Sequence, residues 1–329
     1  MDERGLLDLI VSLLPDLKAT DKITMQNALN SEEELYLHSK QDIEKLINRK
    51  LKRCWDINEI RDRADRIDTI CRMRSIKWVS WTSAEYPPLL REIYDSPSVI
   101  FYRGVLPNPE KSLLGMVGTR KPSPEAADQS NKIAYNAGQA GISVVSGLAF
   151  GIDAMSHRGN LSGGAAGFAV LGSGVDEIYP LLNRPLAKRI LDCGGALISE
   201  YPPGVRPSKW TFPARNRIIS ALSRSVIIVE APQKSGALIT ASFALEQGKD
   251  LWVASTGVLP STDGRTLYDK RGTVKLAEDG AEIIYSARDI FEKWNMKITG
   301  NDDNSMVPGK ETLKSELISY MANFLDIEI

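Results

Sequence analysis

The stretch Leu113–Gly147, LLGMVGTRKPSPEAADQSNKIAYNAGQAGISVVSG, decides the fold that the sequence predicts. It opens with an apolar run at 113–117, passes through a glycine-containing loop into a helix-like segment that starts near Pro124, and closes with a second apolar run at 142–145. Continuous apolar runs of this length are typical of strands buried on both faces, and parallel strands need a crossover between them. The stretch therefore predicts a strand–helix–strand unit of a parallel sheet.

The same alternation extends along the chain on both sides of this unit. Right-handed crossovers in such a pattern place helices on both faces of the sheet. The predicted fold class is therefore α/β, with a doubly wound and mostly parallel sheet. Further strand-like runs occur at 99–102, 168–171, 196–199, 226–229, 251–254 and 282–285.

The composition of the chain changes near residue 80, which predicts a division into domains. Residues 1–80 place apolar residues at three-to-four spacing and contain almost no glycine after Gly5, as expected of a small, separate, all-helical domain. The sheet-containing domain is expected at 81–297. Residues 298–329 form a polar linker and a short tail, too few for a further domain.

The overall charge of the chain gives no sign of a partner. The sequence has 41 Lys and Arg residues against 42 Asp and Glu, a net charge of −1, so any nucleic-acid surface must come from local clustering. No apolar run approaches the roughly 20 residues that span a bilayer, and the N-terminus is acidic, so we expect a cytoplasmic protein without membrane contact. The three cysteines are far apart and show no metal-binding spacing, and no metal or cofactor is expected.

The loops that follow the strands are the candidate binding site, because ligands of a doubly wound sheet lie beyond the carboxyl ends of its strands. Three of these loops combine glycine with polar or basic residues and lead into a helix, whose N-terminal N–H groups favour an anion. Glycine lets the backbone approach a ligand closely, and arginine offers a planar fork for a phosphate. The residues are Gly118, Thr119, Arg120 and Lys121 in the first loop, Ser146 and Gly147 in the second, and Lys234, Ser235 and Gly236 in the third.

Cations and aromatic rings alternate most densely in EYPPGVRPSKWTFPARNRIIS, residues 200–220. Cations neutralise phosphates and an exposed ring stacks on a base, so this composition favours single-stranded nucleic acid. A second interpretation stays open, in which the rings are buried and the arginines pair with acids. The residues concerned are Arg206, Lys209, Trp210, Phe212, Arg215, Asn216 and Arg217.

Motifs of catalysis are sparse. The sequence contains no G-x-x-x-x-G-K-[ST], H-E-x-x-H or G-x-S-x-G pattern and only two histidines. Asp153 and His157 stand four residues apart and could form a pair on one helical face, although a capping role is the expected one for Asp153. Glu200 and Glu230 end strands at the predicted ligand edge, where either could orient a ribose or a basic side chain. We expect a non-catalytic binding protein.

Seven segments of the sequence together carry a family resemblance: YPPLL at 86–90, GTRKPS at 118–123, SGLAFGIDAMSH at 146–157, LGSGVDEIYP at 171–180, SEYPPG at 199–204, FPARNRIISALS at 212–223 and VEAPQKSGALITASFALEQGKDLWV at 229–253. With these segments the chain resembles the DNA-processing protein DprA (Smf) family over about residues 84–297. The resemblance implies an extended Rossmann-like fold that binds and protects single-stranded DNA, forms a homodimer, and loads the RecA recombinase during natural transformation or DNA repair.

The resemblance also implies roles for individual residues. Arg120 would contact a phosphate, Lys209 the DNA backbone and Phe212 a base, with Arg215 and Arg217 nearby. The N-terminal region at 1–80 would be similar to a sterile-alpha or helix-hairpin-helix domain. The tail is too short for the winged-helix domain that many members of the family carry.

Two alternatives stand beside this expectation. The same superfamily resembles phosphoribohydrolases of nucleoside monophosphates, which carry P-G-G-x-G-T-x-x-E where this chain has PQKSGALITASFA at 232–244, without the double glycine and the acid. A nucleotide-sensing relative that acts in defence against foreign DNA is the other. The chain also has Ser255-Thr256-Gly257 where the family usually has Pro-Gly, so the loop at this position is expected to differ.

Overall fold

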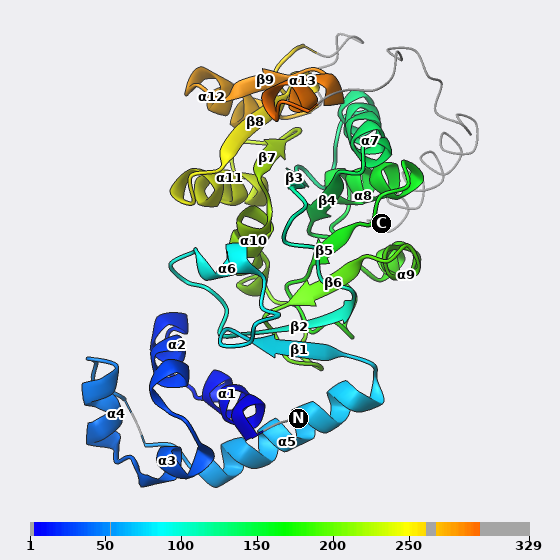
Figure 1. Ribbon diagram of the computed structural model, residues 1–329. Coiled ribbons are helices and arrows are strands. Elements are labelled where there is room, and N and C mark those ends of the chain that lie inside the picture. The colour runs from blue at the N-terminus through cyan, green and yellow to red at the C-terminus, as the bar shows by residue number, and fades with distance from the viewer. Residues whose placement is uncertain (1–2, 53, 261–267, 297–329) are drawn as a thin grey trace, which may run out of the picture. The chain divides into compact units, whose positions relative to one another are not determined.

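A computed structural model describes residues 3–52, 54–260 and 268–296 of the chain (Figure 1). The chain divides into two compact units, Met1–Ile290 and Phe291–Ile329. Every element that positions the candidate site belongs to the first unit. The predicted linker and tail at 298–329 lie outside the described residues.

Helices occupy the described N-terminal residues up to Met73. Polar side chains at Ser31, Ser39 and Asp56 accept hydrogen bonds from the first turns of three of them, which satisfies N–H groups that a helix leaves open. Residues 77–80, expected in the helical region, form a strand instead, and the extent of a separate N-terminal domain stays a prediction. The helices are α1 (Glu3–Leu13), α2 (Ala19–Ala28), α3 (Glu32–Leu37), α4 (Lys40–Leu46) and α5 (Ile57–Met73).

A nine-stranded sheet in the order β1-β2-β6-β5-β4-β3-β7-β8-β9 forms the centre of the first unit. β1 pairs with β2 and β2 with β6 in antiparallel fashion, and the other neighbours are parallel. The predicted α/β class with a mostly parallel sheet is confirmed. The strands are β1 (Lys77–Ser80), β2 (Val99–Gly104), β3 (Leu113–Val117), β4 (Ser143–Ser146), β5 (Phe168–Val170), β6 (Ala196–Ser199), β7 (Ser225–Ile228), β8 (Asp250–Ala254) and β9 (Glu282–Ile284).

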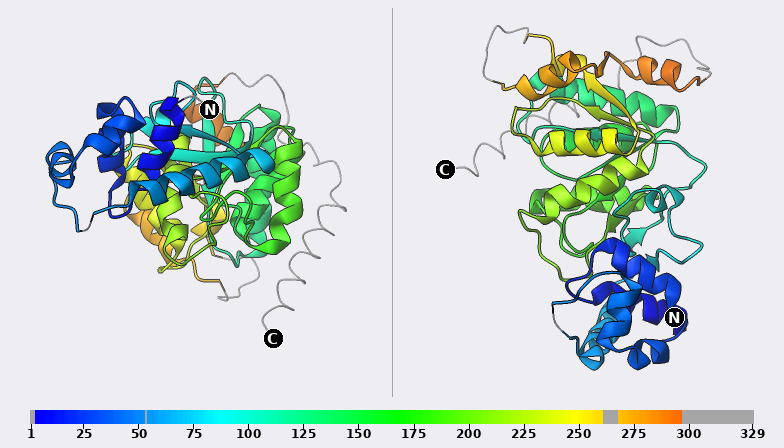
Figure 2. Two further views of the ribbon diagram at one scale, coloured as in Figure 1. Left: turned by 90° about the horizontal axis from the view of Figure 1, so that it is seen from below. Right: turned by 90° about the vertical axis from the view of Figure 1, so that its left-hand side faces the viewer.

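Helices cover both faces of this sheet, as the doubly wound pattern requires (Figures 1 and 2). α7, α8 and α9 pack against one another in sequence on one face, and α10 packs against α11 on the other. The direction of the crossovers reverses between β3 and β7, which are hydrogen-bonded neighbours. The remaining helices are α6 (Pro88–Arg91), α7 (Pro124–Gln139), α8 (Ile152–Ser162), η1 (Leu181–Asn183), α9 (Arg184–Asp192), α10 (Thr211–Leu222), α11 (Gly236–Glu246), η2 (Ser255–Gly257), α12 (Arg271–Glu278) and α13 (Ala287–Lys293).

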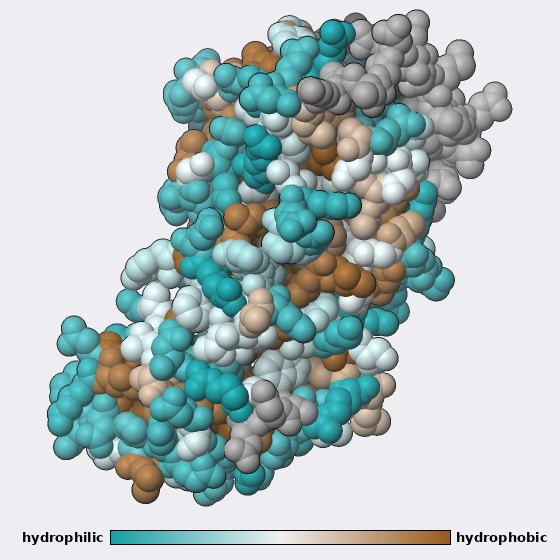
Figure 3. Space-filling model, in the orientation of Figure 1, coloured by the Kyte–Doolittle hydropathy of each residue, from teal (hydrophilic) through white to brown (hydrophobic). Residues whose placement is uncertain are grey.

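Most residues of the interior strands are buried, which explains the continuous apolar sequences of these strands. Every residue of β3, β5, β6 and β7 is buried. On the face shown in Figure 3, hydrophilic residues predominate and hydrophobic residues form smaller groups between them. Among the described residues, no helix is both long enough and apolar enough to span a membrane.

Candidate nucleic-acid interface

The segment between β6 and α10 ends in a tight turn held by Ser208 and Thr211. The backbone N–H of Ser208 donates to Thr211 Oγ1 at 2.9 Å, and the backbone N–H of Thr211 donates to Ser208 Oγ at 3.2 Å. Lys209 and Trp210 lie between these two residues, and both side chains are exposed. Phe212 follows in the first turn of α10 and is half-buried. The turn therefore presents a cation and two rings at the carboxyl edge of the sheet.

Two loops converge on the ring of Phe212. The Arg120 guanidinium, from the loop after β3, has its Cζ 5.4 Å from the ring centroid, and the Tyr179 ring, from the loop after β5, lies 5.7 Å away at an angle of 44°. Gly172 follows β5, and a Cβ there would stand 3.1 Å from Phe212 Cδ1, tighter than ordinary packing allows. The glycine leaves the space in which Phe212 packs. The structure thus brings Arg120 and Phe212 together, as the sequence led us to expect.

Tyr179 is a member of this group that the sequence reasoning missed. Its side chain is 47% exposed, although its ring contacts Phe212. The available signal was an aromatic residue directly before Pro180, in a loop that follows a predicted strand. Half-exposed aromatic rings are suited to stacking on flat ligands.

Arg215 is buried and joins α10 to the ends of two strands. Its guanidinium donates to the carbonyl oxygens of Gly147, at 2.7 Å, and of Val170, and lies 3.9 Å from the Asp153 carboxylate. Burial lowers the pKa of Arg215 to about 10 and raises that of Asp153, and each partly offsets the other through its opposite charge. A Cβ at Gly147 would stand 2.0 Å from Arg215 Nη2. Gly147 therefore makes room for an arginine of the protein itself.

Arg217 is buried as well and pairs with acids. Both of its terminal nitrogens donate to the carboxylate of Glu200 at 2.7 Å, and its Nε lies 2.8 Å from the Asp95 carboxylate. Burial opposes the charge of Arg217, but the hydrogen bonds and charge of Glu200 outweigh that effect and raise its pKa. For Arg217, the interpretation in which an arginine pairs with acids is the one the structure supports. For Trp210, which is 75% exposed, burial in the core is excluded.

Glu230 and Ser146 serve the loops of the sheet edge. Glu230 accepts hydrogen bonds from the backbone N–H of Ser123 at 2.8 Å and from its hydroxyl at 2.6 Å, while the Glu230 carbonyl accepts one from Thr119 N–H at 2.7 Å. Burial raises the pKa of Glu230, and the hydrogen bonds from Ser123 lower it in part. The hydroxyl of buried Ser146 donates to the Met116 carbonyl at 2.6 Å. These contacts fix the loop that carries Arg120 and exposed Lys121.

The third predicted loop lies at the start of α11. Ser235 caps this helix by accepting a hydrogen bond from the Ala237 N–H at 3.2 Å. A Cβ at Gly236 would meet nothing within 4 Å, so no close approach requires glycine there. The Asn216 side-chain amide donates to the Gly236 carbonyl at 3.1 Å, which ties this loop to α10. Lys234 is exposed beside it.

Asp153 and His157 do not form a catalytic pair. Asp153 accepts hydrogen bonds from the backbone N–H groups of Gly147 at 3.1 Å and Ala149 at 3.3 Å, in the loop that precedes α8. The expected capping role is wrong, because the N-cap of α8 is Gly151, and Asp153 instead holds the loop before the helix. His157 is fully buried, and neither ring nitrogen has a hydrogen-bond partner within the described structure. Burial lowers the pKa of His157 to about 3, and the nearby charge of Arg215 adds to the effect. The imidazole is therefore neutral at physiological pH and shielded from a substrate.

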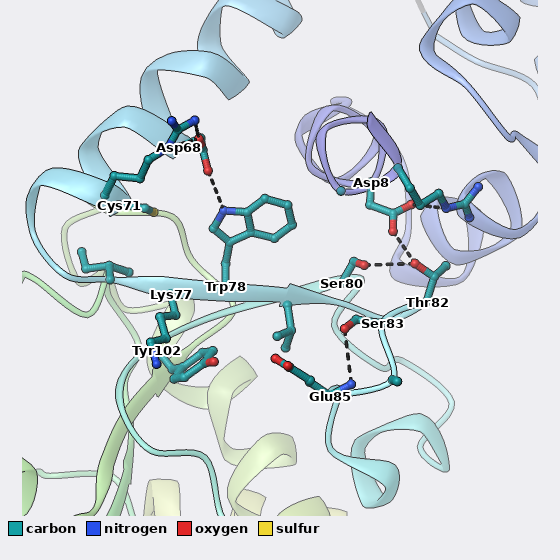
Figure 4. A pocket seen from close by; sticks show the side chains of 16 residues that line it. Asp8, Asp68, Cys71, Lys77, Trp78, Ser80, Thr82, Ser83, Glu85 and Tyr102 are labelled. Atoms are coloured by element: carbon teal, nitrogen blue, oxygen red, sulfur yellow. Dashed lines mark hydrogen bonds and ion pairs between the residues drawn. The ribbon is translucent and has the colours of Figure 1, made fainter. Parts of the chain in front are cut away.

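A cavity of about 690 Å³ lies elsewhere, between α1, α5 and β1 (Figure 4). On one side Trp78 Nε1 donates to Asp68 at 3.1 Å, and on the other Asp8 accepts a hydrogen bond from Thr82. Arg72 pairs with Asp68, and the Nε of Arg4 lies 3.7 Å from Asp8. These balanced charges do not favour a phosphate chain. Within the described ranges, no group of three or more His, Cys, Asp or Glu residues is placed to hold a metal ion.

The parallel sheet and the cation-bearing loops at its carboxyl edge define a Rossmann-like α/β protein with a candidate nucleotide-binding edge. Residues 77–295 match the family model described as DNA recombination-mediator protein A. The chain belongs to this family, whose curated members carry the names DprA and Smf.

Curated relatives support this assignment over most of the chain. The DNA processing protein DprA of Bacillus subtilis is 37% identical over 239 residues, which cover 72% of this chain and 78% of the relative. The protein Smf of Borreliella burgdorferi is 29% identical over 295 residues, 90% of each chain. The match to the protein Smf of a Synechocystis strain is 41% identical and spans 51% of that longer relative.

Two solved structures are similar to the fold. The X-ray structure of DNA processing protein A from Streptococcus pneumoniae has a TM-score of 0.67 at 29% identity, covering 91% of this chain and 99% of that one. A structure of DNA processing protein A from Helicobacter pylori, reported for its single-stranded DNA binding mode, has a TM-score of 0.56 at 26% identity. The match covers 67% of this chain and 96% of that one.

The Arg217–Glu200 pair predicts a loss of stability on substitution. Glu200→Gln keeps the shape of the side chain but removes its charge, so we expect the free energy of unfolding to fall by about 1.5–3 kcal/mol. Urea unfolding measures the difference. Glu246→Gln, on the exposed side of α11, is the matched control and should stay within about 0.5 kcal/mol of the parent. Equal stability of both variants would contradict the pairing.

Buried His157 predicts a loss of stability in acid. The pKa of histidine is about 6.5 in an unfolded chain. Because the folded value is lower, the unfolded state binds more protons, and stability falls as the pH drops below about 6.5. Between pH 7 and pH 5 this residue should remove about 2 kcal/mol from the free energy of unfolding. In urea titrations, the free energy of unfolding of His157→Leu should therefore fall by about 2 kcal/mol less than that of the parent between pH 7 and pH 5. If the variant and the parent show the same pH dependence, His157 is not held neutral in the folded protein.

Proposed function

We propose that the chain binds single-stranded DNA on the surface formed by Arg120, Lys209 and Phe212. The single observation that carries this proposal is the Arg120 guanidinium placed 5.4 Å from the centroid of the Phe212 ring. A cation beside a ring matches a nucleotide, which joins a flat base to a charged phosphate. Arg120 and Lys209 would bind phosphates, and Phe212 would stack on a base.

The comparisons support this proposal without deciding the residues. The family is described as a recombination mediator, and the relative from Helicobacter pylori is reported with a single-stranded DNA binding mode. The chain has a net charge of −1, so the attraction for DNA must come from the local exposed cations. Besides Arg120 and Lys209, these are Lys121 and Arg206, with Lys234 at the start of α11.

The remaining predicted residues divide by their exposure. Arg215, Asn216 and Arg217 are buried in α10, and we assign them the role of holding its first turn in place. The backbone N–H groups of Ala126 and Ala237, at the starts of α7 and α11, already have partners. We therefore assign phosphate binding to side chains. Ser146, Gly147 and Thr119 shape the loops after β4 and β3, while Lys234, Ser235 and Gly236 would extend the surface at α11.

The proposed physiological role is that of a non-catalytic recombination mediator. By the resemblance to its family, the chain would act as a homodimer, protect incoming or repair DNA, and load the RecA recombinase on it. No observation favours the phosphoribohydrolase alternative, because the acid nearest to such a role, Glu230, is engaged by Ser123.

Substitutions at the proposed surface should separate charge from stacking. Oligothymidylate binding should weaken with salt, with a logarithmic slope of about −0.7 for each neutralised phosphate. Arg120→Ala and Lys209→Ala should each lower the affinity and make the slope less negative by about 0.7. Phe212→Leu should lower the affinity by about 1–3 kcal/mol and leave the slope nearly unchanged. Fluorescence anisotropy at several salt concentrations measures both quantities.

Lys275→Ala is the matched control for this series. Lys275 is exposed on α12, pairs with Asp279 at 2.8 Å, and is distant in sequence from Arg120, Lys209 and Phe212. This variant should bind with the affinity and the salt slope of the parent. Parent-like binding by the Arg120, Lys209 and Phe212 variants together would refute the assignment of the surface.

RecA loading predicts a result in a reconstituted reaction. On an oligonucleotide already coated by a single-stranded DNA-binding protein, the chain should shorten the delay before RecA assembles, seen as DNA-dependent ATP hydrolysis. Lys209→Ala should lengthen the delay because it weakens the contact with DNA. A parent protein that binds the oligonucleotide but leaves the delay unchanged would exclude RecA loading and leave DNA binding intact.

A further inference from the structure

Trp210 is exposed beside the proposed contact residues. Its side chain is 75% exposed, whereas the other five tryptophans of the sequence, all within the described ranges, are buried or half-buried. A tryptophan in water gains none of the stabilisation that burial of its large ring provides. Packing in the core therefore does not account for the ring at this position.

The backbone of Trp210 is nevertheless held in place. Its N–H donates to Ser208 Oγ at 3.3 Å, and its carbonyl accepts a hydrogen bond from the Ala214 N–H at 3.4 Å. The reciprocal hydrogen bonds between Ser208 and Thr211 enclose the same turn. A ring on a fixed backbone loses little conformational freedom when it binds a ligand.

A cation accompanies this ring, as one accompanies Phe212. Lys209 Nζ lies 4.9 Å from the centroid of the Trp210 ring, close to the 5.4 Å between Arg120 Cζ and the Phe212 centroid. Both rings come from the turn that opens α10, with one residue between them. Two pairs of a cation and a ring therefore meet at this turn. Arg120 reaches Phe212 from the loop after β3, whereas Lys209 and Trp210 both belong to the turn and are both exposed.

We propose that Trp210 stacks on a second base of the bound strand, so that the interface holds at least two bases. One base lies at Phe212 with Arg120 near its phosphate, and the other lies at Trp210 with Lys209 near its phosphate. This inference rests on the proposed binding of single-stranded DNA. Every base has a flat face, so the second step adds affinity with little preference for sequence.

The fluorescence of Trp210 and a pair of substitutions test the inference. Oligothymidylate should quench the emission of the parent, because the most exposed indole becomes covered by a base. Trp210→Phe retains a ring, so it should keep the parental affinity within about threefold and lose the quenching. Trp210→Leu retains bulk without a ring and should bind at least about fivefold more weakly. Thermal unfolding of both variants should match the parent, since the side chain is exposed.

An abasic chain of the same length separates stacking from contact with phosphates. It offers phosphates and sugars without bases, so it should not quench Trp210 emission, and Trp210→Leu should bind it as the parent does. A second control introduces Lys209→Met. If Trp210 stacks by itself, Trp210→Leu should still weaken oligothymidylate binding at least about fivefold in this background.

Each outcome separates this inference from the proposed function. If the parent binds oligothymidylate and Trp210→Leu binds it equally well, the second stacking step is overturned and the proposed DNA binding still holds. An equal loss for the abasic chain, or no loss in the Lys209→Met background, would show that Trp210 acts only by placing Lys209 and would also overturn it. Failure of the parent to bind any oligonucleotide would instead reject the proposed function itself.

Discussion

The buried guanidinium of Arg215 is the contact on which the geometry of the interface depends. The side chain extends from α10, and its guanidinium donates to carbonyl oxygens at the ends of β4 and β5, where Gly147 provides the space for it. Backbone carbonyls at the ends of strands would otherwise be left without donors in a buried position, which costs free energy. The same arginine therefore satisfies the edge of the sheet and fixes the helix that carries Phe212. Arg217 reinforces this placement through Glu200, directly after β6.

Because of that constraint, the buried and the exposed cations have different roles. Buried arginines have their hydrogen bonds and charges used within the protein, so they hold the scaffold. Exposed Arg120 and Lys209 lie over aromatic rings instead of acids. A chain of almost neutral charge can in this way present a basic and aromatic surface on one edge of its sheet. The field there is local, and salt should screen it.

The sequence predicted the interior of the fold better than its edges. The inner parallel strands are almost fully buried and so appear as continuous apolar runs. β1, KWVS, is an antiparallel edge strand that is only partly buried, and it was assigned to the helical region. The rule that loops after parallel strands share one edge brought Arg120 and Phe212 together correctly. This rule did not distinguish exposed from buried arginines, because Glu200, the acid partner of Arg217, follows β6 and is distant in sequence from Arg217 on α10. Tyr179 was missed for the same reason, since its contact with Phe212 joins two loops distant in sequence.

The structure of the protein with a short oligothymidylate bound tests the central claim most directly. The account predicts a base against the ring of Phe212 and phosphate oxygens within hydrogen-bond distance of Arg120 or Lys209, with Arg215 and Arg217 still bound to their partners in the protein. An oligonucleotide bound on another surface, such as the cavity between α1, α5 and β1, or one that displaces Arg217 from Glu200, would contradict it.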